Sequence, residues 1–278
     1  MKSRRFIRRR PKDIQMWIGA SIVLFFVAIA LLAPLLAPYD PLEVVIPRRL
    51  QAPSSDHWLG TDDLGRDNLS RILYGARVSL IVGVAATAIG AAIGTVLGIV
   101  AGYFGGVKDS IIMRFIDILL AFPGLLLALA IVTVLGSSTR NVILAVAIFA
   151  VPSFARIVRG STLSVKKLEY IDAIRAIGAK DIRIIFVHVL PNILSPIIVQ
   201  ATLNVGGAIV TAAALSFLGV GTPPPTPEWG AMVDRGRAFL IQAPHMIYFP
   251  GLMIFLLVVG INMFGDGLRD YLEPKKTR

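Results

Sequence analysis

The sequence has 278 residues, of which 55% are apolar and 16% charged, and its mean hydropathy is +0.74. Soluble domains usually carry about 25% charged residues, so this chain has too little charge to cover a water-facing surface. An ordinary soluble enzyme is therefore excluded, and the absence of cysteine excludes disulfides and cysteine-ligated metal sites. The net charge of +11 would suggest nucleic acid in a soluble protein. In a membrane protein such an excess orients the spans instead, so we expect no nucleic-acid partner.

Six apolar stretches of about 20 residues predict an all-α membrane protein with six transmembrane helices. A basic N-terminal segment, residues 1–13, precedes the first helix, residues 14–38. This stretch is longer than the apolar region of a typical signal peptide, so we favour an uncleaved span over a cleaved leader. Residues 39–77 are proline-rich and predict a turn-rich segment outside the membrane. The core occupies residues 78–265, and residues 266–278 form a C-terminal segment.

The core is predicted to hold five spans, at about 78–103, 115–135, 141–156, 193–219 and 246–265. Residues 157–191 connect the fourth and fifth spans of the chain, and a proline-rich loop at 220–245 connects the last two. If the N-terminus is cytoplasmic, that side carries more than twice as many Lys and Arg residues as the other. The positive-inside rule therefore places both termini and residues 157–191 in the cytoplasm, and the segments 39–77 and 220–245 outside.

Four glycines recur at every fourth position of the second span and therefore lie on one helix face. Small residues on such a face let two helices approach closely, which favours association where lipid leaves little hydrophobic driving force. We interpret these positions as helix-packing residues, and a groove that lines a translocation path is the alternative. The four are Gly90, Gly94, Gly98 and Gly102.

Two charges open the third span. Arg114 and Asp117 lie three residues apart, one helical turn along the same face, and predict an ion pair at the cytoplasmic membrane boundary. A proton-relay carboxylate at Asp117 is the alternative interpretation.

The connection at 157–191 contains a short amphipathic pattern. Charged residues from Lys166 to Arg175 run beside apolar residues from Leu168 to Ile177, and Gly178 follows as a C-terminal cap. A second amphipathic stretch covers residues 179–188, and Pro191 marks the turn into the next span. The pattern alone fits either a helix on the membrane surface or a docking element for a cytoplasmic partner.

The run from Glu169 to Gly178, followed by His188-Val-Leu-Pro-Asn192, resembles the cytoplasmic loop signature of permease subunits of bacterial ABC importers. That signature reads Glu-Ala-Ala, three residues and Gly, and later Ile-x-Leu-Pro. Ala173, Gly178, Leu190 and Pro191 match it, whereas Asp172 stands for Glu, Ile174 for the second Ala and His188 for Ile. Two further stretches, His57-Trp-Leu-Gly-Thr-Asp-Asp-Leu-Gly-Arg-Asp67 and Gly265-Asp-Gly-Leu-Arg-Asp270, are similar to C-type subunits of dipeptide, oligopeptide and nickel importers.

The resemblance implies a lipid-embedded permease subunit of a bacterial or archaeal plasma membrane, with no catalytic site or cofactor of its own. It implies a sister permease that completes a translocation path for peptides, two ATPase subunits that bind ATP and magnesium, and an external solute-binding protein. The short helix would be the coupling helix seated on an ATPase subunit. The ATPase-coupling residues implied are Glu169, Asp172, Ala173, Gly178, Leu190 and Pro191. Dipeptides, oligopeptides, nickel chelates, glutathione-like compounds and sugar oligomers all remain open as cargo.

Two other classes of function compete with this interpretation. A membrane hydrolase or zinc enzyme is disfavoured because His57 and His245 are predicted outside and His188 inside, and no catalytic motif is present. A secondary transporter or channel usually places ionisable residues near the middle of the membrane, and the central parts of these spans have none. That pattern favours a chain energised by a partner, as does the lack of a G-x-x-x-x-G-K-[ST] phosphate-binding loop.

Overall fold

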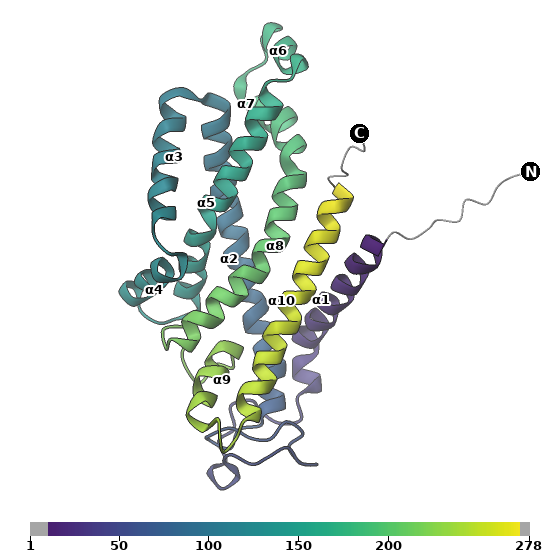
Figure 1. The fold of residues 1–278 in the computed structure, drawn as a ribbon, viewed down its shortest axis with the longest axis vertical. Coiled ribbons are helices and arrows are strands. Elements are labelled where there is room, and N and C mark those ends of the chain that lie inside the picture. The colour runs from purple at the N-terminus through teal and green to yellow at the C-terminus, as the bar shows by residue number, and fades with distance from the viewer. Residues whose placement is uncertain (1–10, 273–278) are drawn as a thin grey trace, which may run out of the picture.

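The computed structural model describes residues 11–272, which form an elongated bundle of α-helices (Figure 1). Residues 1–10 of the predicted basic segment and residues 273–278 of the predicted C-terminal segment lie outside the described part. Within residues 11–272 the only β-pairing is an isolated bridge between Thr61 and Asp67. Among these described residues, five helices are long and apolar enough to cross a membrane, and a bent pair raises the number to six. The expected all-helical class is confirmed.

The helices of spanning length are distributed along the whole chain. They are α1 (Pro11–Leu36), α2 (Asn68–Phe104), α5 (Thr139–Lys166), α8 (Leu190–Phe217) and α10 (His245–Leu272), with α3 (Gly106–Ala121) and α4 (Gly124–Leu135) as the bent pair. The shorter elements are η1 (Ile46–Arg48), α6 (Glu169–Ala176), α7 (Asp181–Arg183), the π-helix η2 (Ile184–Val189), α9 (Trp229–Gly236) and η3 (Arg237–Phe239).

The single span predicted at 115–135 is instead two helices that meet at an angle of 91°. Phe122 is extended, with φ −88° and ψ 138°, and Pro123 follows it. A residue before proline is driven out of the helical region by the proline ring, so α3 ends there and α4 restarts after it. Helix α3 also begins at Gly106, earlier than the start predicted for this span.

The predicted connection at 157–191 is shorter in the structure. The helix α5 runs on to Lys166, and from Asp181 the chain is helical without interruption to Phe217. The predicted turn at Pro191 is wrong, because Pro191 is the second residue of α8 and the π-helix η2 comes immediately before that helix. Wider π-type hydrogen bonding accommodates a residue that has no N–H and that crowds the preceding turn.

The two segments predicted to be external also contain helices that the apolar pattern did not indicate. The first ten residues of α2, 68–77, lie in the segment predicted to be external and turn-rich, and α9 lies inside the predicted loop 220–245. Helix α2 begins there because the carboxylate of Asp67 caps it, accepting a 2.7 Å hydrogen bond from the Ser70 amide. Both connections gather at the lower end of the bundle in Figure 1.

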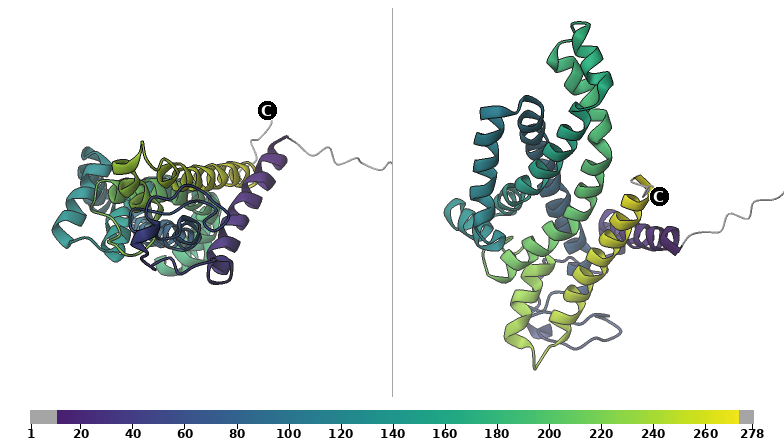
Figure 2. Two further views of the ribbon diagram at one scale, coloured as in Figure 1. Left: turned by 90° about the horizontal axis from the view of Figure 1, so that it is seen from below. Right: turned by 45° about the horizontal axis from the view of Figure 1, so that its top comes forward.

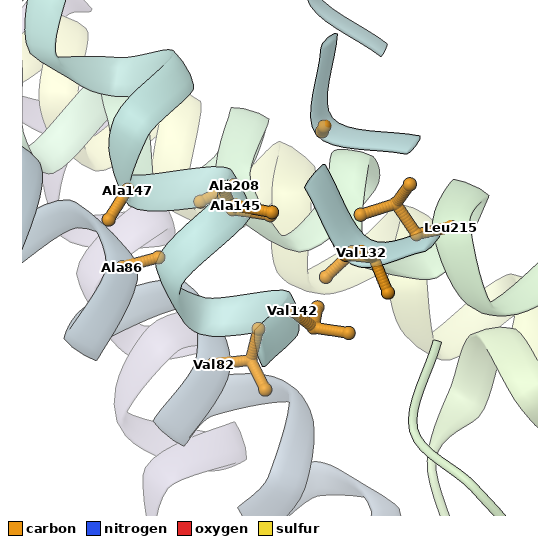
Figure 3. Close-up of a cluster of buried hydrophobic side chains, with 11 residues drawn as sticks. Val82, Ala86, Val132, Val142, Ala145, Ala147, Ala208 and Leu215 are labelled. Atoms are coloured by element: carbon orange, nitrogen blue, oxygen red, sulfur yellow. The ribbon is translucent and has the colours of Figure 1, made fainter. Parts of the chain in front are cut away.

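The core forms where α2, α4, α5 and α8 meet. Small and β-branched side chains fill it, among them Val82 of α2, Val132 of α4, Val142 of α5 and Ala208 of α8 (Figure 3). Helix α1 packs against α10 and α2, on the opposite side of the bundle from α3 and α4 (Figure 2). The first span therefore belongs to this chain's own packed body.

Candidate functional site

The predicted coupling element lies at the extreme upper end of the bundle in Figure 1, and we call residues 167–183 the tip. It contains α6 and α7. Glu169 and Asp172 lie in the first turn of α6 and Arg175 in its last, an order that complements the helix dipole. Arg175 also contacts the Asp172 carboxylate at 3.4 Å within the helix.

Gly178 ends α6 in a Schellman turn. Its φ is +87°, a backbone conformation that side chains with a Cβ rarely adopt. The Gly178 amide donates to the Arg175 carbonyl at 3.0 Å, and the Ala179 amide donates to the Ile174 carbonyl at 3.3 Å. These two bonds are the signature of the motif, and they satisfy two carbonyl groups in the last turn of α6 as the chain reverses direction.

The inner face of the tip is apolar. Ile171 of α6 is fully buried in a cluster with Ile184 and Val189 of η2, together with Ile99 and Tyr103 of α2. This contact anchors α6 to the long helices below it.

The outer face of the tip is exposed and partly apolar. Ile177 is 84% exposed, and Leu168, Tyr170, Ile182 and Phe186 nearby are exposed as well. Of the predicted coupling residues, Glu169, Asp172, Ala173 and Gly178 are exposed on the tip. Leu190 is half-buried and Pro191 exposed, and both lie in the first turn of α8, outside the tip. The structure thus brings four of the six together.

Polar contacts that the sequence did not reveal lie behind the tip. The hydroxyl of Tyr103, at the end of α2, is 2.7 Å from the Asp181 carboxylate and 3.5 Å from the Arg175 guanidinium. The Tyr103 carbonyl accepts a 2.5 Å hydrogen bond from the Lys166 ammonium. A lone tyrosine in the last turn of an apolar helix resembles an ordinary interface residue, and only the fold shows that α5, α6 and α7 converge on it.

The four glycines of α2 face α5 along its length. A Cβ added at Gly90 or Gly98 would lie 2.7 Å from a side-chain Cβ on α5, and one added at Gly94 would lie 2.5 Å from the Cβ of Phe154. At Gly102 the nearest atoms of α5 are 2.9 Å away. The stripe therefore permits close packing of two long helices, since nothing larger fits between them.

The predicted ion pair between Arg114 and Asp117 does not form. Asp117 instead contacts Arg156 of α5 at 2.6 Å, and Asp109, about two turns earlier in α3, binds Arg159 through two hydrogen bonds of 2.6 Å. Helix α3 packs against α5, which places these arginines within reach. Local spacing along α3 predicted the wrong partner because the tertiary contact offers a better one.

Comparison with known proteins identifies the family. Residues 94–278 match the family of binding-protein-dependent transport system inner membrane components, and residues 4–53 match the N-terminal transmembrane domain of oligopeptide transport permease C. The chain belongs to this family of ABC importer permeases. It is a C-type permease subunit of the peptide group, a multi-pass inner-membrane protein, and ATP hydrolysis belongs to partner subunits of such importers.

Relatives of the permease match over almost its whole length. Glutathione transport system permease protein GsiD of Shigella dysenteriae serotype 1 is 51% identical over 271 residues, covering 97% of this chain and 89% of that protein. The protein of the same name from Pectobacterium atrosepticum is 50% identical over 274 residues, covering 98% and 89%. The resemblance inferred from three short stretches of sequence is thereby confirmed.

Solved structures share the fold of the permease at low sequence identity. Two crystal forms of the MetNI methionine ABC transporter, described as inward-facing conformations, each match with a TM-score of 0.60. Their identities are 18% and 19%, and they cover 75% and 76% of this chain and 97% and 98% of the matched chains.

The opposite end of the permease is held by buried charges. Asp67 pairs with His57 at 2.9 Å, Asp62 pairs with Arg66 at 2.6 Å, and Arg71 lies 3.6 Å from the same Asp62. All five side chains are buried. This network, drawn largely from the sequence stretch at residues 57–67, fixes the segment before α2 against the start of that helix.

Helix α9 joins the same end through polar contacts of its own. Arg235 of α9 lies 3.5 Å from Asp63, and His245, the first residue of α10, contacts the Thr61 carbonyl at 3.1 Å. The Glu228 carboxylate caps α9 by accepting bonds of 2.9 Å from the amides of Gly230 and Ala231. Burial raises the pKa of Glu228 above its ordinary value, against the opposing effect of these hydrogen bonds.

Proposed function

We propose that the permease pairs with a sister permease to carry small peptides into the cell, with glutathione as the first candidate cargo. Two ATPase subunits drive this transport, and an external solute-binding protein delivers the substrate. Relatives about half identical over nearly the full chain are glutathione transport permeases, which supports this choice of cargo. The ATPase-coupling role is assigned from the structure of the tip.

The tip has the construction that a coupling helix requires. Its inner face is fixed to α2 and η2 by Ile171, whereas its outer face presents Ile177 and neighbouring apolar side chains to solvent. An exposed apolar patch with polar neighbours is typical of a protein-binding surface. Because the tip is short and capped, a partner that moves it displaces the attached helices as a rigid body.

The sides of the membrane follow from charge and shape together. The first turn of α1 and the last turn of α10 lie toward the end of the bundle that carries the tip, away from α9 (Figure 1). Lys and Arg are concentrated in the segments at that end, and cytoplasmic segments carry such an excess. We therefore assign the tip and both termini to the cytoplasm and α9 to the external face.

Affinity purification of the tagged chain from native membranes tests both the partners and the sides. We expect a second permease and ATPase subunits to be recovered with the wild-type chain. The substitution Ile177→Asp should abolish recovery of the ATPase. Ile241→Asp is the matched control, since Ile241 is 96% exposed at the opposite end and the change should leave ATPase recovery intact. Equal recovery with both variants would contradict the coupling role of the tip.

Gly178 offers a second test with an internal control. Gly178 and Gly136 both have φ +87°, and no atom lies within 4 Å of a Cβ added at either position. Gly178→Glu and Gly136→Glu therefore both place a side chain at a positive φ, with no atom in the way, and add the same charge. We expect only the Gly178 variant to lose ATPase binding and transport, so equal losses would assign the effect to strain alone.

Cargo is tested by uptake into vesicles that contain the recovered assembly and its binding protein. We expect ATP-dependent uptake of labelled glutathione that excess unlabelled glutathione suppresses and that a simple dipeptide suppresses more weakly. Stronger suppression by the dipeptide would indicate that dipeptides, and not glutathione, are the cargo. Uptake without ATP, driven by a proton gradient, would contradict the importer as a whole.

A further inference from the structure

The strongest unexplained feature of the molecule is the polar cluster behind the tip. Tyr103 is the penultimate residue of α2 and is 3% exposed, yet its hydroxyl bridges Asp181 of α7 and Arg175 of α6. Its main-chain carbonyl is bound by Lys166, the last residue of α5. One buried residue thus contacts both helices of the tip and the helix that precedes it.

The hydroxyl acts in two directions. It donates to the Asp181 carboxylate at 2.7 Å, and its oxygen accepts from the Arg175 guanidinium at 3.5 Å. Arg175 in turn contacts Asp172 at 3.4 Å on the exposed side of α6. A continuous polar path therefore runs from the outer surface of the tip to the end of α2.

The apolar contacts of the tip do not supply the same constraint. Ile171 holds α6 close to η2 and α2, but dispersion contacts are not directional. Hydrogen bonds to charged groups fix both distance and angle, and they are roughly twice as strong as neutral ones. The Tyr103 hydroxyl therefore sets the orientation of α6 and α7 relative to α2.

Helix α2 is suited to pass that orientation on. Its glycine face packs closely against α5, and its other end is fixed through Asp67 and Arg71. We infer that Tyr103 is a positioning residue that transmits displacement of the tip to α2 during each transport cycle. This inference rests on the proposed function, in which the ATPase subunits displace the tip.

The test uses the complete assembly in lipid vesicles and measures solute transported per ATP hydrolysed. Tyr103→Phe keeps the ring and removes the hydroxyl, and Asp181→Asn, on an exposed residue, weakens the same bond from the other side. Both variants should lower transport per ATP about tenfold, the usual effect of one hydrogen bond to a charged group. Tyr103→Phe, whose side chain is buried behind the tip, should also leave ATPase recovery and hydrolysis unchanged. Tyr248→Phe removes a hydroxyl from an exposed tyrosine at the far end and should change the ratio less than about twofold.

The double variant of Tyr103 and Asp181 separates transmission from simple destabilisation. Because both changes remove one bond, it should be no worse than either single variant. A merely structural role would lower the amount of folded assembly but not transport per ATP. A normal ratio of transport to ATP hydrolysis in Tyr103→Phe, or losses that multiply in the double variant, would overturn this inference but not the proposed function. A wild-type assembly without ATPase subunits or ATP-dependent uptake would overturn the proposed function and this inference together.

Discussion

The substitution Gly94→Ala examines the contact between α2 and α5 directly. The added methyl carbon would lie 2.5 Å from the Phe154 Cβ and 2.7 Å from the Val151 carbonyl oxygen. Carbon atoms pack best at about 3.5–4.0 Å, so the two helices must separate by about 1 Å or more locally. Both obstructing atoms belong to or adjoin the backbone of α5, and they cannot rotate away.

The expected cost follows from two opposing effects. Overpacking of a well-packed contact costs about 1–3 kcal/mol. Replacing glycine by alanine within a helix returns about 0.5–1 kcal/mol through reduced backbone freedom in the unfolded chain. The net loss in free energy of unfolding is therefore about 1–2 kcal/mol. At about 2–4 °C per kcal/mol, the midpoint of thermal unfolding should fall by about 2–8 °C.

Gly160→Ala is the matched control, because no atom lies within 4 Å of a Cβ added at Gly160 on α5. It should raise the midpoint by about 1–4 °C through the helix-propensity gain alone. Both variants are measured in the same detergent by the loss of the monodisperse chromatographic peak on heating. If Gly94→Ala were as stable as Gly160→Ala, α2 and α5 would not be packed as closely as the structure shows, and the interpretation of the stripe would fail.

Two further predictions concern charge. Because burial raises the pKa of Glu228, its carboxyl group favours folding most at low pH, and this contribution is lost as pH rises from about 4.3 through the raised pKa. The unfolding midpoint of wild type minus that of Glu228→Gln should therefore decrease between about pH 4 and pH 8, and an increase would contradict the direction of the shift. Arg159→Leu, which breaks the two-bond pair with Asp109, should cost about 1–2 kcal/mol in free energy of unfolding. Arg156→Leu breaks an exposed pair and should cost less than about 1 kcal/mol, so equal losses in chemical unfolding would refute the distinction.

The features that sequence predicts well here are those that depend on local periodicity. Apolar stretches locate every helix of spanning length, because each must satisfy its own backbone hydrogen bonds in lipid. The four-residue spacing places Gly94 and its companions on one face, and the structure puts that face against α5. The amphipathic pattern before Gly178 locates α6, and the glycine marks its end because only a positive φ closes the Schellman turn.

The features that sequence misses depend on contacts between distant elements. The apolar pattern predicts the third span as one segment, whereas α3 ends before Pro123 and meets α4 at 91°, and both helices pack against α5. Pro191 suggests a turn, whereas it lies in the first turn of α8 within a continuous helix. Asp117 binds an arginine on another helix in place of its sequence neighbour. No local pattern gives Tyr103 its role, because its partners lie 63 to 78 positions away.

The two ends of the permease are held by different kinds of interaction, and this difference suits the proposed mechanism. At the α9 end, buried ion pairs such as Asp62 with Arg66 are costly to break, since each partner would be left charged and unpaired away from water. At the tip, α6 is held by one apolar cluster and a few hydrogen bonds at its edge, and most of its side chains face solvent. In the proposed mechanism, force applied by a partner at the tip passes to α2 through these contacts, while the buried pairs hold the far end of α2. A displacement of the tip would then reorient α2 about that end, which is the type of motion that opens one side of a translocation path while the other remains closed.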